Sequence, residues 1–316
     1  MRTTHCYYGI FFFVSIAMHH ASLRASFWED AKTWVQGWYK KHHEVIDQQY
    51  RCIPNSSLSI KNPHGSIHIE SAWTENNIVL SAKKSGQSLQ ALKACDIVHY
   101  ETNNGASITL ETVHHDTQSC ATVDYTLIVP AHVKNINLEL EDGSIIMSDY
   151  QGTITALTEH GNIDIHTCTG AITAEITAKG SIFINQAEGP VTATTCKGPI
   201  TIMQSQNNVT AKTHCGRIRV YCKQLLPQHE LWLQTKNGLI QLYAPTTINA
   251  RLRAKTEYGT FSSQLPVTVN EFTTLLDTSA WKRFRQEISG ILGVSGDARV
   301  SLYSRDSNIE IKKIEA

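Results

Sequence analysis

Two acidic side chains, Asp164 and Glu175, stand in the repetitive part of the sequence at positions that point outward from a predicted strand. Cleavage of a glycosidic bond needs two carboxyl groups about 5–9 Å apart. Strands lie about 4.8 Å apart in a sheet, so such a pair would come from neighbouring repeats. The equivalent positions there carry no second acid: Ile146, Phe183, Leu157 and Thr194. The turn residues Glu159 and Glu188 are interpreted as solvated corners, so no catalytic carboxylate pair is predicted.

Histidine is abundant, with 15 residues, and could ligate a metal ion. The sequence has no HExxH motif and no pair of histidines four apart on a predicted helix with a carboxylate. The doublets His42-His43 and His114-His115 are poor chelates, because neighbouring residues on a strand point to opposite faces. GxSxG motifs and glycine-rich phosphate loops are also absent from the sequence. We therefore expect no metal, no cofactor and no catalytic residue, hence a protein that is not an enzyme.

Eight cysteines are spread through the chain without CxxC spacing, so neither a zinc ribbon nor a thioredoxin-type site is indicated. Cys95 and Cys120 flank a predicted hairpin, and Cys196 and Cys215 lie about one repeat apart. Either pair could form a disulfide in an oxidising compartment. The alternative is that all these thiols fill small positions in the strands as single side chains.

Glycine recurs about every nine residues through the middle of the chain. Two half-units alternate, Gly-x-Ile-x-Ile and Gly-x-Ile/Val-Thr-Ala, so the full unit has 18 to 19 residues and two short strands. A fixed period of this length indicates a stacked-repeat architecture. Glycine suits the sharp corners between strands, because it tolerates positive φ and the close approach of another backbone. The sequence therefore predicts an all-β, single-chain β-solenoid (a β-helix).

Alternation within each half-unit separates interior from exterior positions. Two interior columns line one wall and two line the opposite wall: Ile145, Ile163, Ile182, Ile200, Ile218 and Ile240; Met147, Ile165, Ile184, Ile202, Val220 and Leu242; Ile154, Ile172, Val191 and Val209; Ala156, Ala174, Ala193 and Ala211. Alanine opposite isoleucine predicts a narrow interior that is filled by side chains and has no room for a ligand.

One outward column is regular and consists of Thr155, Thr173, Thr192 and Thr210. A flat array of hydroxyls would resemble ice-binding solenoids, but the second threonine of their Thr-x-Thr pattern is missing here. Threonine is favoured in strands because it is β-branched and can form hydrogen bonds across strands. We expect this column to have a structural role.

The N-terminal segment predicts export. Arg2 precedes an apolar run over residues 7–18, and small residues follow, as in a secretory signal. Residues 1–25 are therefore assigned as a signal peptide or, alternatively, an uncleaved N-terminal anchor. Residues 26–50 are expected to form an aromatic linker or helix, which could also associate with a membrane. The net charge is zero, so no overall field attracts nucleic acid, and no nucleic-acid partner is expected.

The rest of the chain is divided by its strand pattern. Residues 51–140 show period-two strands and form the β-rich N-terminal region of the solenoid, including a hairpin whose Asn-Asn-Gly turn ends at Gly105. Residues 141–316 form the regular β-solenoid. An excursion at 264–295, which could contain a helix, interrupts it, and closing strands at 297–312 are expected to cap its end.

Four features point together to one family: the string His64-Gly-Ser-Ile-His-Ile with a nearby tryptophan, the strand Val123-Asp-Tyr-Thr-Leu-Ile-Val-Pro130, the run of Gly-Asn/Ser-Ile units, and the closing stretch Gly296 to Ile311. With them the chain resembles the bacterial putative-adhesin family of β-solenoid domains of unknown function, over roughly residues 50–314. The resemblance implies a protein that is exported or membrane-associated; some members take part in envelope-stress sensing. The family has no established catalytic residues to carry over.

The predicted function is that of an exported, non-enzymatic, adhesin-like scaffold that binds a protein or a glycan at the cell envelope. Loops on a rigid scaffold are the usual place for binding residues, so interruptions of the period give the candidates. These are Trp281, Arg283 and Arg285 in the excursion, and Pro227 and His229 in an insertion at 223–229. The alternatives are a membrane-anchored envelope-stress sensor and a carbohydrate-active β-helix enzyme.

Overall fold

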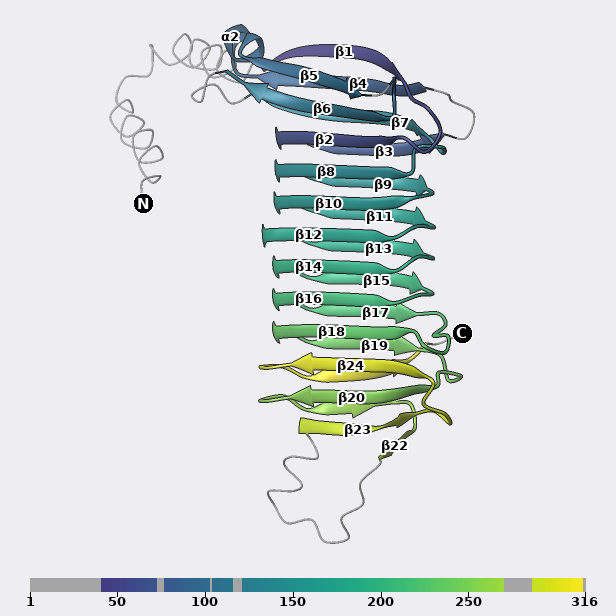
Figure 1. The fold of residues 1–316 in the computed structure, drawn as a ribbon. Helices are drawn as coiled ribbons and strands as arrows, with labels where there is room; N and C mark the ends of the chain where they lie inside the picture. Colours follow the sequence, from purple (N-terminus) through teal and green to yellow (C-terminus); the bar gives the residue numbers. More distant parts are fainter. Residues whose placement is uncertain (1–40, 73–76, 103, 116–120, 270–285, 315–316) are drawn as a thin grey trace, which may run out of the picture.

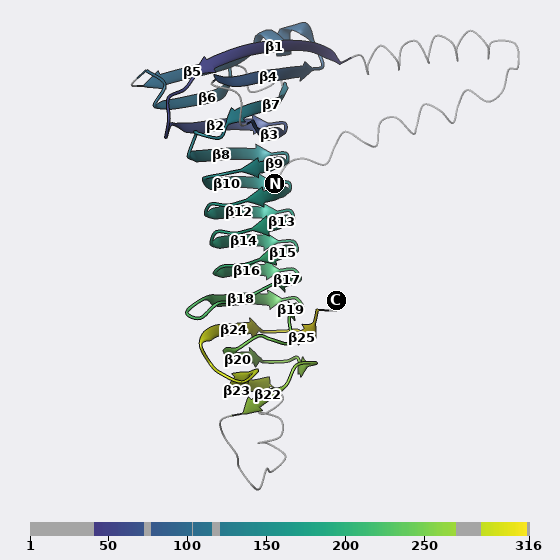
Figure 2. The ribbon, with the colours of Figure 1, turned by 90° about the vertical axis from the view of Figure 1, so that its right-hand side faces the viewer.

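A computed structural model describes residues 41–72, 77–102, 104–115, 121–269 and 286–314. In this part of the chain the protein is a β-solenoid, which confirms the predicted fold class (Figure 1). Each regular coil contributes one strand to each of two long sheets, and the two sheets face each other across a narrow core (Figure 2).

The first sheet, called sheet A, has 12 described strands. In spatial order they are β1 (His42–Arg51), β4 (Asn77–Gly86), β7 (Thr122–Pro130), β3 (Ile67–Ala72), β9 (Ile145–Tyr150), β11 (Ile163–Cys168), β13 (Ile182–Ala187), β15 (Ile200–Ser205), β17 (Ile218–Cys222), β19 (Ile240–Ala244), β25 (Ile309–Lys313) and β21 (Phe261–Ser263).

The second sheet, called sheet B, has 13 described strands. In spatial order they are β22 (Val267–Val269), β23 (Glu287–Leu292), β20 (Ala250–Thr256), β24 (Ala298–Ser304), β18 (Glu230–Asn237), β16 (Val209–Cys215), β14 (Val191–Lys197), β12 (Ile172–Lys179), β10 (Thr153–His160), β8 (Asn135–Asp142), β2 (Ser57–His64), β6 (Ser107–His114) and β5 (Cys95–Thr102). The helix α2 (Leu89–Lys93) precedes β5. Within the described ranges, no helix has the length and apolar character needed to cross a membrane.

The four predicted interior columns form the core. Neighbouring coils pair in parallel and in register, so that Ile163 lies between Ile145 and Ile182 in sheet A. In sheet B, Ile154 pairs with Ile172 in the same way. All members of the four columns are at most 1% exposed. The apolar side chains therefore stack in continuous rows along the solenoid axis, where their burial drives folding.

A further interior column in sheet B is polar. Thr213, Thr235 and Ser304 are at most 2% exposed, and each donates its hydroxyl hydrogen to the backbone carbonyl of a corner glycine. For Thr235 the acceptor is the carbonyl of Gly216, at 3.1 Å. Buried hydroxyls need such partners, because an unsatisfied polar group in the core destabilises the fold.

The corner glycines are required mainly by close approach. A Cβ atom on Gly161, whose φ is +135°, would lie 1.7 Å from the carbonyl oxygen of Gly143 in the coil before it. One on Gly180 would lie 1.5 Å from the carbonyl oxygen of Gly161. The backbones of successive corners therefore touch directly, and no side chain fits between them.

The N-terminal end of the stack is built from antiparallel strands (top of Figure 1). β1 pairs with β4, β4 with β7, and β5 with β6, which confirms the predicted hairpin. The linker or helix expected over residues 26–50 is wrong for its last part, because residues 42–50 lie in β1 and pair along the whole of β4. Residues 1–40, with the predicted signal peptide, lie outside the described chain.

The C-terminal end differs from the expectation. The strands assigned to close the stack, β24 and β25, lie inside it: β24 sits between β18 and β20, and β25 between β19 and β21. The outermost described strands of sheet B are instead the antiparallel pair β22 and β23. Residues 287–292 of the excursion thus form a strand, whereas residues 270–285 are not described. The sequence pattern did not predict these positions, because they depend on pairing between strands that are far apart in the chain, and periodicity reflects only local structure.

A candidate binding groove on sheet B

A bulge divides the outer face of sheet B. Between β10 and β12 the register passes from the pair Thr158–Ile176 to the pair His160–Lys179, so β12 contains an additional residue. This is the unit in which 19 rather than 18 residues separate two glycines, Gly161 and Gly180. A bulge bends a strand and redirects its side chains. At the bulge, Thr177 is exposed on the outer face.

Two hollows lie on this face, one on each side of Thr177. The first has a volume of about 480 Å³ and is lined mainly by β12, β14, β16, β18 and the end of β24. The second has a volume of about 370 Å³ and is lined mainly by β2, β6, β8 and β10. Because Thr177 lines both, the two hollows adjoin each other along the solenoid axis, and together we call them the sheet B groove.

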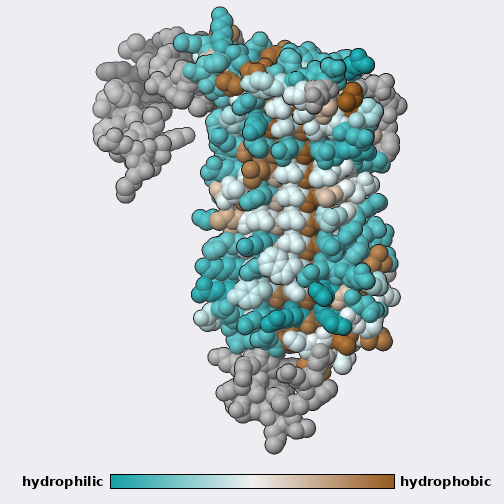
Figure 3. Space-filling view, viewed as in Figure 1, coloured by the Kyte–Doolittle hydropathy of each residue, from teal (hydrophilic) through white to brown (hydrophobic). Residues whose placement is uncertain are grey.

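Threonines flank the groove. The predicted column of outward threonines is confirmed by the register, which pairs Thr155 with Thr173, Thr173 with Thr192, and Thr192 with Thr210. The column ends at Trp232 of β18, which pairs with Thr210. Figure 3 looks onto this face and shows a pale stripe of intermediate hydropathy along the middle, with hydrophilic side chains on either side.

The two halves of the groove carry opposite charge. The half around β8 is lined by four glutamates, Glu111, Glu139, Glu141 and Glu159, and by one lysine, Lys61. The half around β16 is lined by Glu175 against three bases: Lys212, Lys236 and Arg305. The net charge of the lining residues is therefore −3 in one half (one lysine minus four glutamates) and +2 in the other (three bases minus one glutamate).

Several of these charges are not neutralised within the protein. Lys61 forms an ion pair with Glu139, with 3.1 Å between the nitrogen and the oxygen. By contrast, no ion pair among the described residues engages Lys212, Lys236 or Glu141. By the register, Glu141 lies beside Glu159 on the next strand, and Lys236 lies beside Arg305. Like charges at such positions destabilise a sheet, so the groove holds electrostatic potential that a ligand could neutralise.

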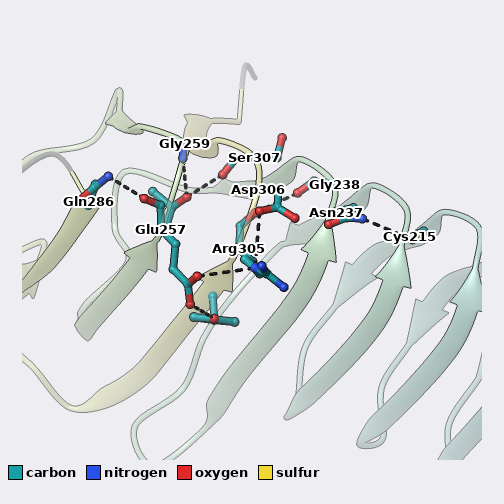
Figure 4. A network of polar contacts seen from close by, with 12 residues as sticks. Cys215, Asn237, Gly238, Glu257, Gly259, Gln286, Arg305, Asp306 and Ser307 are labelled. Atoms are coloured by element: carbon teal, nitrogen blue, oxygen red, sulfur yellow. Dashed lines mark hydrogen bonds and ion pairs between the residues drawn. The ribbon is translucent and has the colours of Figure 1, made fainter.

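The basic end of the groove is held by a polar network (Figure 4). Glu257 accepts a 2.7 Å hydrogen bond from the hydroxyl of Tyr303, and its carboxylate lies 3.6 Å from Nε of Arg305. That hydrogen bond is the main reason why the pKa of Tyr303 lies above its ordinary value. Gln286 donates to the backbone carbonyl of Glu257. The network fixes Tyr303 and Arg305 at the end of the groove.

The outer face of sheet A is organised differently. Nε of Arg219 donates to Gln241 at 3.3 Å, and the amide of Gln241 donates to Glu310 at 2.9 Å. Lys312 closes the chain with a 3.0 Å ion pair to Glu310. We call these four residues the sheet A ladder. Beside it, the rings of Tyr221 and Tyr243 stack 4.1 Å apart. The four residues of the ladder therefore partner one another within the protein.

The candidate residues from the sequence are not brought together in the groove. Pro227 is exposed and His229 half-buried in the loop between β17 and β18, and neither lines a hollow. The backbone of this loop is tied to β24 and the residue before it: Gln228 N–H donates to Asp297, and Arg299 N–H donates to His229. Trp281, Arg283 and Arg285 lie outside the described residues. These assignments remain predictions.

The expectations about individual acids have mixed outcomes. Asp164 lies between Ile146 and Phe183 on neighbouring strands, without a second acid, and its partial burial raises its pKa. Glu159, interpreted as a solvated corner, is exposed but lies in β10 beside Glu141 and lines the groove. The pair was missed because Glu141 falls before the first regular glycine. The pair could have been found by comparing the charges of outward-pointing residues on neighbouring strands.

The cysteine alternatives are partly resolved. Cys196 and Cys215 are both free thiols, and the register pairs Cys215 with Lys197, so that the two cysteines are offset by one residue. Cys168 and Cys222 are buried at small interior positions, where burial raises their pKa values. Cys95 is also buried and free, whereas Cys120 lies outside the described residues. No group of three or more potential metal ligands occurs in the part of the chain that the structure describes.

Comparisons with known proteins concern the fold. No family model and no curated protein matches the chain. A solved structure of a putative adhesin from Bacteroides fragilis is similar, with 13% identity and a TM-score of 0.45, over 86% of this chain and 97% of that one. A putative adhesin from Parabacteroides distasonis has 9% identity and a TM-score of 0.38, over 85% and 97%. A putative cell adhesion protein from Clostridium sporogenes has 10% identity and a TM-score of 0.25, over 87% and 100%.

Proposed function

We propose that the protein is an exported, non-enzymatic, adhesin-like scaffold that binds an elongated protein or glycan along the sheet B groove at a cell envelope. The observation that supports this most directly is a groove in which Lys212, Lys236 and Glu141 have no ion pair among the described residues. From β6 to β24 it crosses the neighbouring strands β6, β2, β8, β10, β12, β14, β16, β18 and β24. At about 4.8 Å per step this corresponds to about 38 Å.

The scaffold suits a long ligand because it is stiff. The backbone groups of each inner strand are bonded to the strands on both sides, and the core columns run uninterrupted through the stack. In solenoids each repeat contacts only its neighbours, which produces an extended surface of fixed shape. A rigid surface loses little conformational entropy on binding, so moderate contacts at many points suffice.

A groove-filling substitution tests this proposal. Thr177 is exposed and lines both halves, so Thr177→Trp would obstruct the groove at its middle. Thr201→Trp, at an outward position of β15 on sheet A, is the matched control. Binding would be measured to immobilised peptidoglycan, a neutral polysaccharide, a sulfated polysaccharide and an unfolded polypeptide. We expect at least one polymer to bind the wild type and the control, with loss of about tenfold or more in affinity for Thr177→Trp. If Thr177→Trp and Thr201→Trp bind equally well, the groove is not the binding site.

Export is the second part of the proposal and rests on the apolar N-terminal run. Cell fractionation with mass analysis of the mature N-terminus tests it. A chain beginning near Ser22 or Ser26 in an exported fraction supports the proposal. An intact N-terminus in the membrane pellet would favour the anchored sensor, and a cytoplasmic protein would contradict export.

One observation favours the alternative of a carbohydrate-active enzyme. Glu141 and Glu159 lie beside each other on neighbouring strands. Strands lie about 4.8 Å apart, which is close to the separation of about 5 Å between the carboxyl groups of retaining glycosidases. Both side chains are exposed, however, whereas a general acid is normally kept protonated in an apolar pocket. Release of reducing sugar from the same polysaccharides, abolished by Glu141→Gln and by Glu159→Gln, would establish the enzyme. If no reducing sugar is released even at high protein concentration, the enzyme alternative is rejected and the binding scaffold is retained.

A further inference from the structure

The order of charge along the groove restricts its ligand, if the proposed binding function holds. Four glutamates line one half and three bases line the other, with Thr177 between them. A polymer lying along the whole groove meets both potentials. It gains from both halves only if its own charge changes sign along its length.

We infer that the groove takes an extended polypeptide segment that carries a block of basic residues and a block of acidic residues. Its basic block lies against Glu111, Glu141 and Glu159, and its acidic block lies against Lys212, Lys236 and Arg305. Proteins are the class of polymer in which both signs of charge commonly follow each other along one chain. A segment of about 12 extended residues, at about 3.3 Å per residue, matches the length of about 38 Å.

Polymers of a single charge fit only half of the groove. A nucleic acid or a sulfated polysaccharide would be attracted to Lys212 and Lys236 but repelled at Glu141 and Glu159. A neutral glycan carries no charge and gains nothing from the order of the two potentials, and flat aromatic rings on which a sugar ring could stack are scarce here. The groove lining contains one aromatic residue, Tyr303, whose hydroxyl is already bonded to Glu257.

The ligand is recognised by side chains and not by strand addition. It runs along the solenoid axis and therefore across the strands, whose backbone groups are already paired with neighbours on both sides. Recognition by charge blocks also means that the segment binds with either block first in its sequence, because turning the peptide around exchanges the two ends.

The test uses a capped, fluorescein-labelled peptide of about 12 residues with lysines at one end, a glycine–serine spacer, and glutamates at the other end. Its isomer with alternating lysine and glutamate has the same composition and net charge. Affinity is measured by fluorescence anisotropy with the full chain at low ionic strength, where charge interactions are least screened. We expect the block peptide to bind about tenfold or more tightly than the isomer.

Charge-reversal variants assign the effect to the groove. Glu141→Lys with Glu159→Lys gives both halves a net positive charge, because the changed half then has three bases and two glutamates. Lys212→Glu with Lys236→Glu gives both halves a net negative charge, because the changed half then has one base and three glutamates. Each double variant should lose the preference for the block peptide. The variant with all four changes has the opposite order of charge, and it should regain the preference because the peptide can bind turned around. This recovery also shows that the double variants did not fail merely by unfolding.

The inference is overturned if the wild type binds block and alternating peptides equally, or if the four-fold variant does not regain the preference while its melting temperature is unchanged. It is also overturned if an all-lysine peptide, an all-glutamate peptide or a neutral glycan binds the wild type more tightly than the block peptide. These results leave the broader proposal standing if Thr177→Trp still abolishes binding to an immobilised polymer. The proposal that the groove is the binding site is rejected only if Thr177→Trp and Thr201→Trp bind an immobilised polymer equally well.

Discussion

The outer faces of the two sheets use the same kinds of side chain in opposite ways. In the sheet A ladder, Arg219, Gln241 and Glu310 are joined from strand to strand by hydrogen bonds. In the sheet B groove, Glu141 lies beside Glu159, and Lys236 beside Arg305. Complementary neighbours stabilise a sheet, and like charges destabilise it. Proteins usually depart from stabilising patterns at functional sites. The like charges of the sheet B groove are therefore the pattern expected of a binding face.

The corners are common to both faces, so breaking one should give the largest effect. Gly161→Val places side-chain atoms where even a Cβ would lie 1.7 Å from the carbonyl oxygen of Gly143. We expect a loss of about 3–5 kcal/mol in the free energy of unfolding, with both faces disrupted together. Urea unfolding followed by circular dichroism measures it. Thr173→Val, at an exposed strand position, is the control and should change the midpoint little. A Gly161→Val protein with wild-type stability would show that the corners can separate.

An intermediate effect should distinguish the two faces at matched positions. Gln241 of the sheet A ladder is 7% exposed and donates to Glu310, whereas the side chain of Gln234 lines the groove and forms no hydrogen bond among the described residues. Gln241→Leu should cost about 1–2 kcal/mol in the free energy of unfolding, because Glu310 and Arg219 lose a partner. Gln234→Leu should cost less than about 0.5 kcal/mol. Chemical denaturation of the two variants side by side makes the comparison, and equal losses would contradict the distinction between the faces.

The smallest effect should appear as a dependence on pH. The hydrogen bond from Gln241, aided by Lys312, holds the pKa of Glu310 below its ordinary value of 4.5. A depressed pKa in the folded state gives stability that is present above pH 4.5 and is lost as the pH falls through the folded-state value.

The measurement is the urea midpoint between neutral pH and about pH 3, the range in which a depressed carboxyl titrates. Glu310→Gln should flatten part of the decline that the wild type shows. Glu175→Gln in the groove is the matched control, because Glu175 has no ion pair among the described residues. If Glu310→Gln and Glu175→Gln flatten the curve equally, Glu310 of the ladder contributes no more than Glu175 to the loss of stability at low pH.

The core was predictable because it follows from alternation alone. Each of the four interior columns named from the sequence is buried, and Ile154, Thr155 and Ala156 pair with Ile172, Thr173 and Ala174 as the period requires. The hairpin was predictable for a local reason: its turn contains Gly105, which adopts a φ of +90°. Both kinds of signal are short-range properties of the chain.

The groove was not predicted, because alternation shows which side chains point outward but not where the outer face is concave. The two hollows meet at one additional residue in β12, which the sequence shows as an interval of 19 instead of 18 residues from Gly161 to Gly180 and from Gly170 to Gly189. Three of the four glutamates in the acidic half also come from β6 and β8, which precede the regular repeats. Interruptions of the period pointed to Pro227 and His229 instead, whereas the smallest irregularity lies at the groove.

The position of β24 and β25 has a consequence for how the chain is made. Synthesis proceeds from the N-terminus, so β20 and β21 leave the ribosome before the strands that must lie between them and the regular coils. Until β24 is available, β18 and β20 each present an unpaired edge, and such edges are templates for association with other chains. The stack is therefore complete only after β24 and β25 have paired between strands that are made earlier. A chain that is truncated before residue 298 lacks both strands, so we expect it to expose the edge of β18 and to aggregate even though its regular repeats are complete.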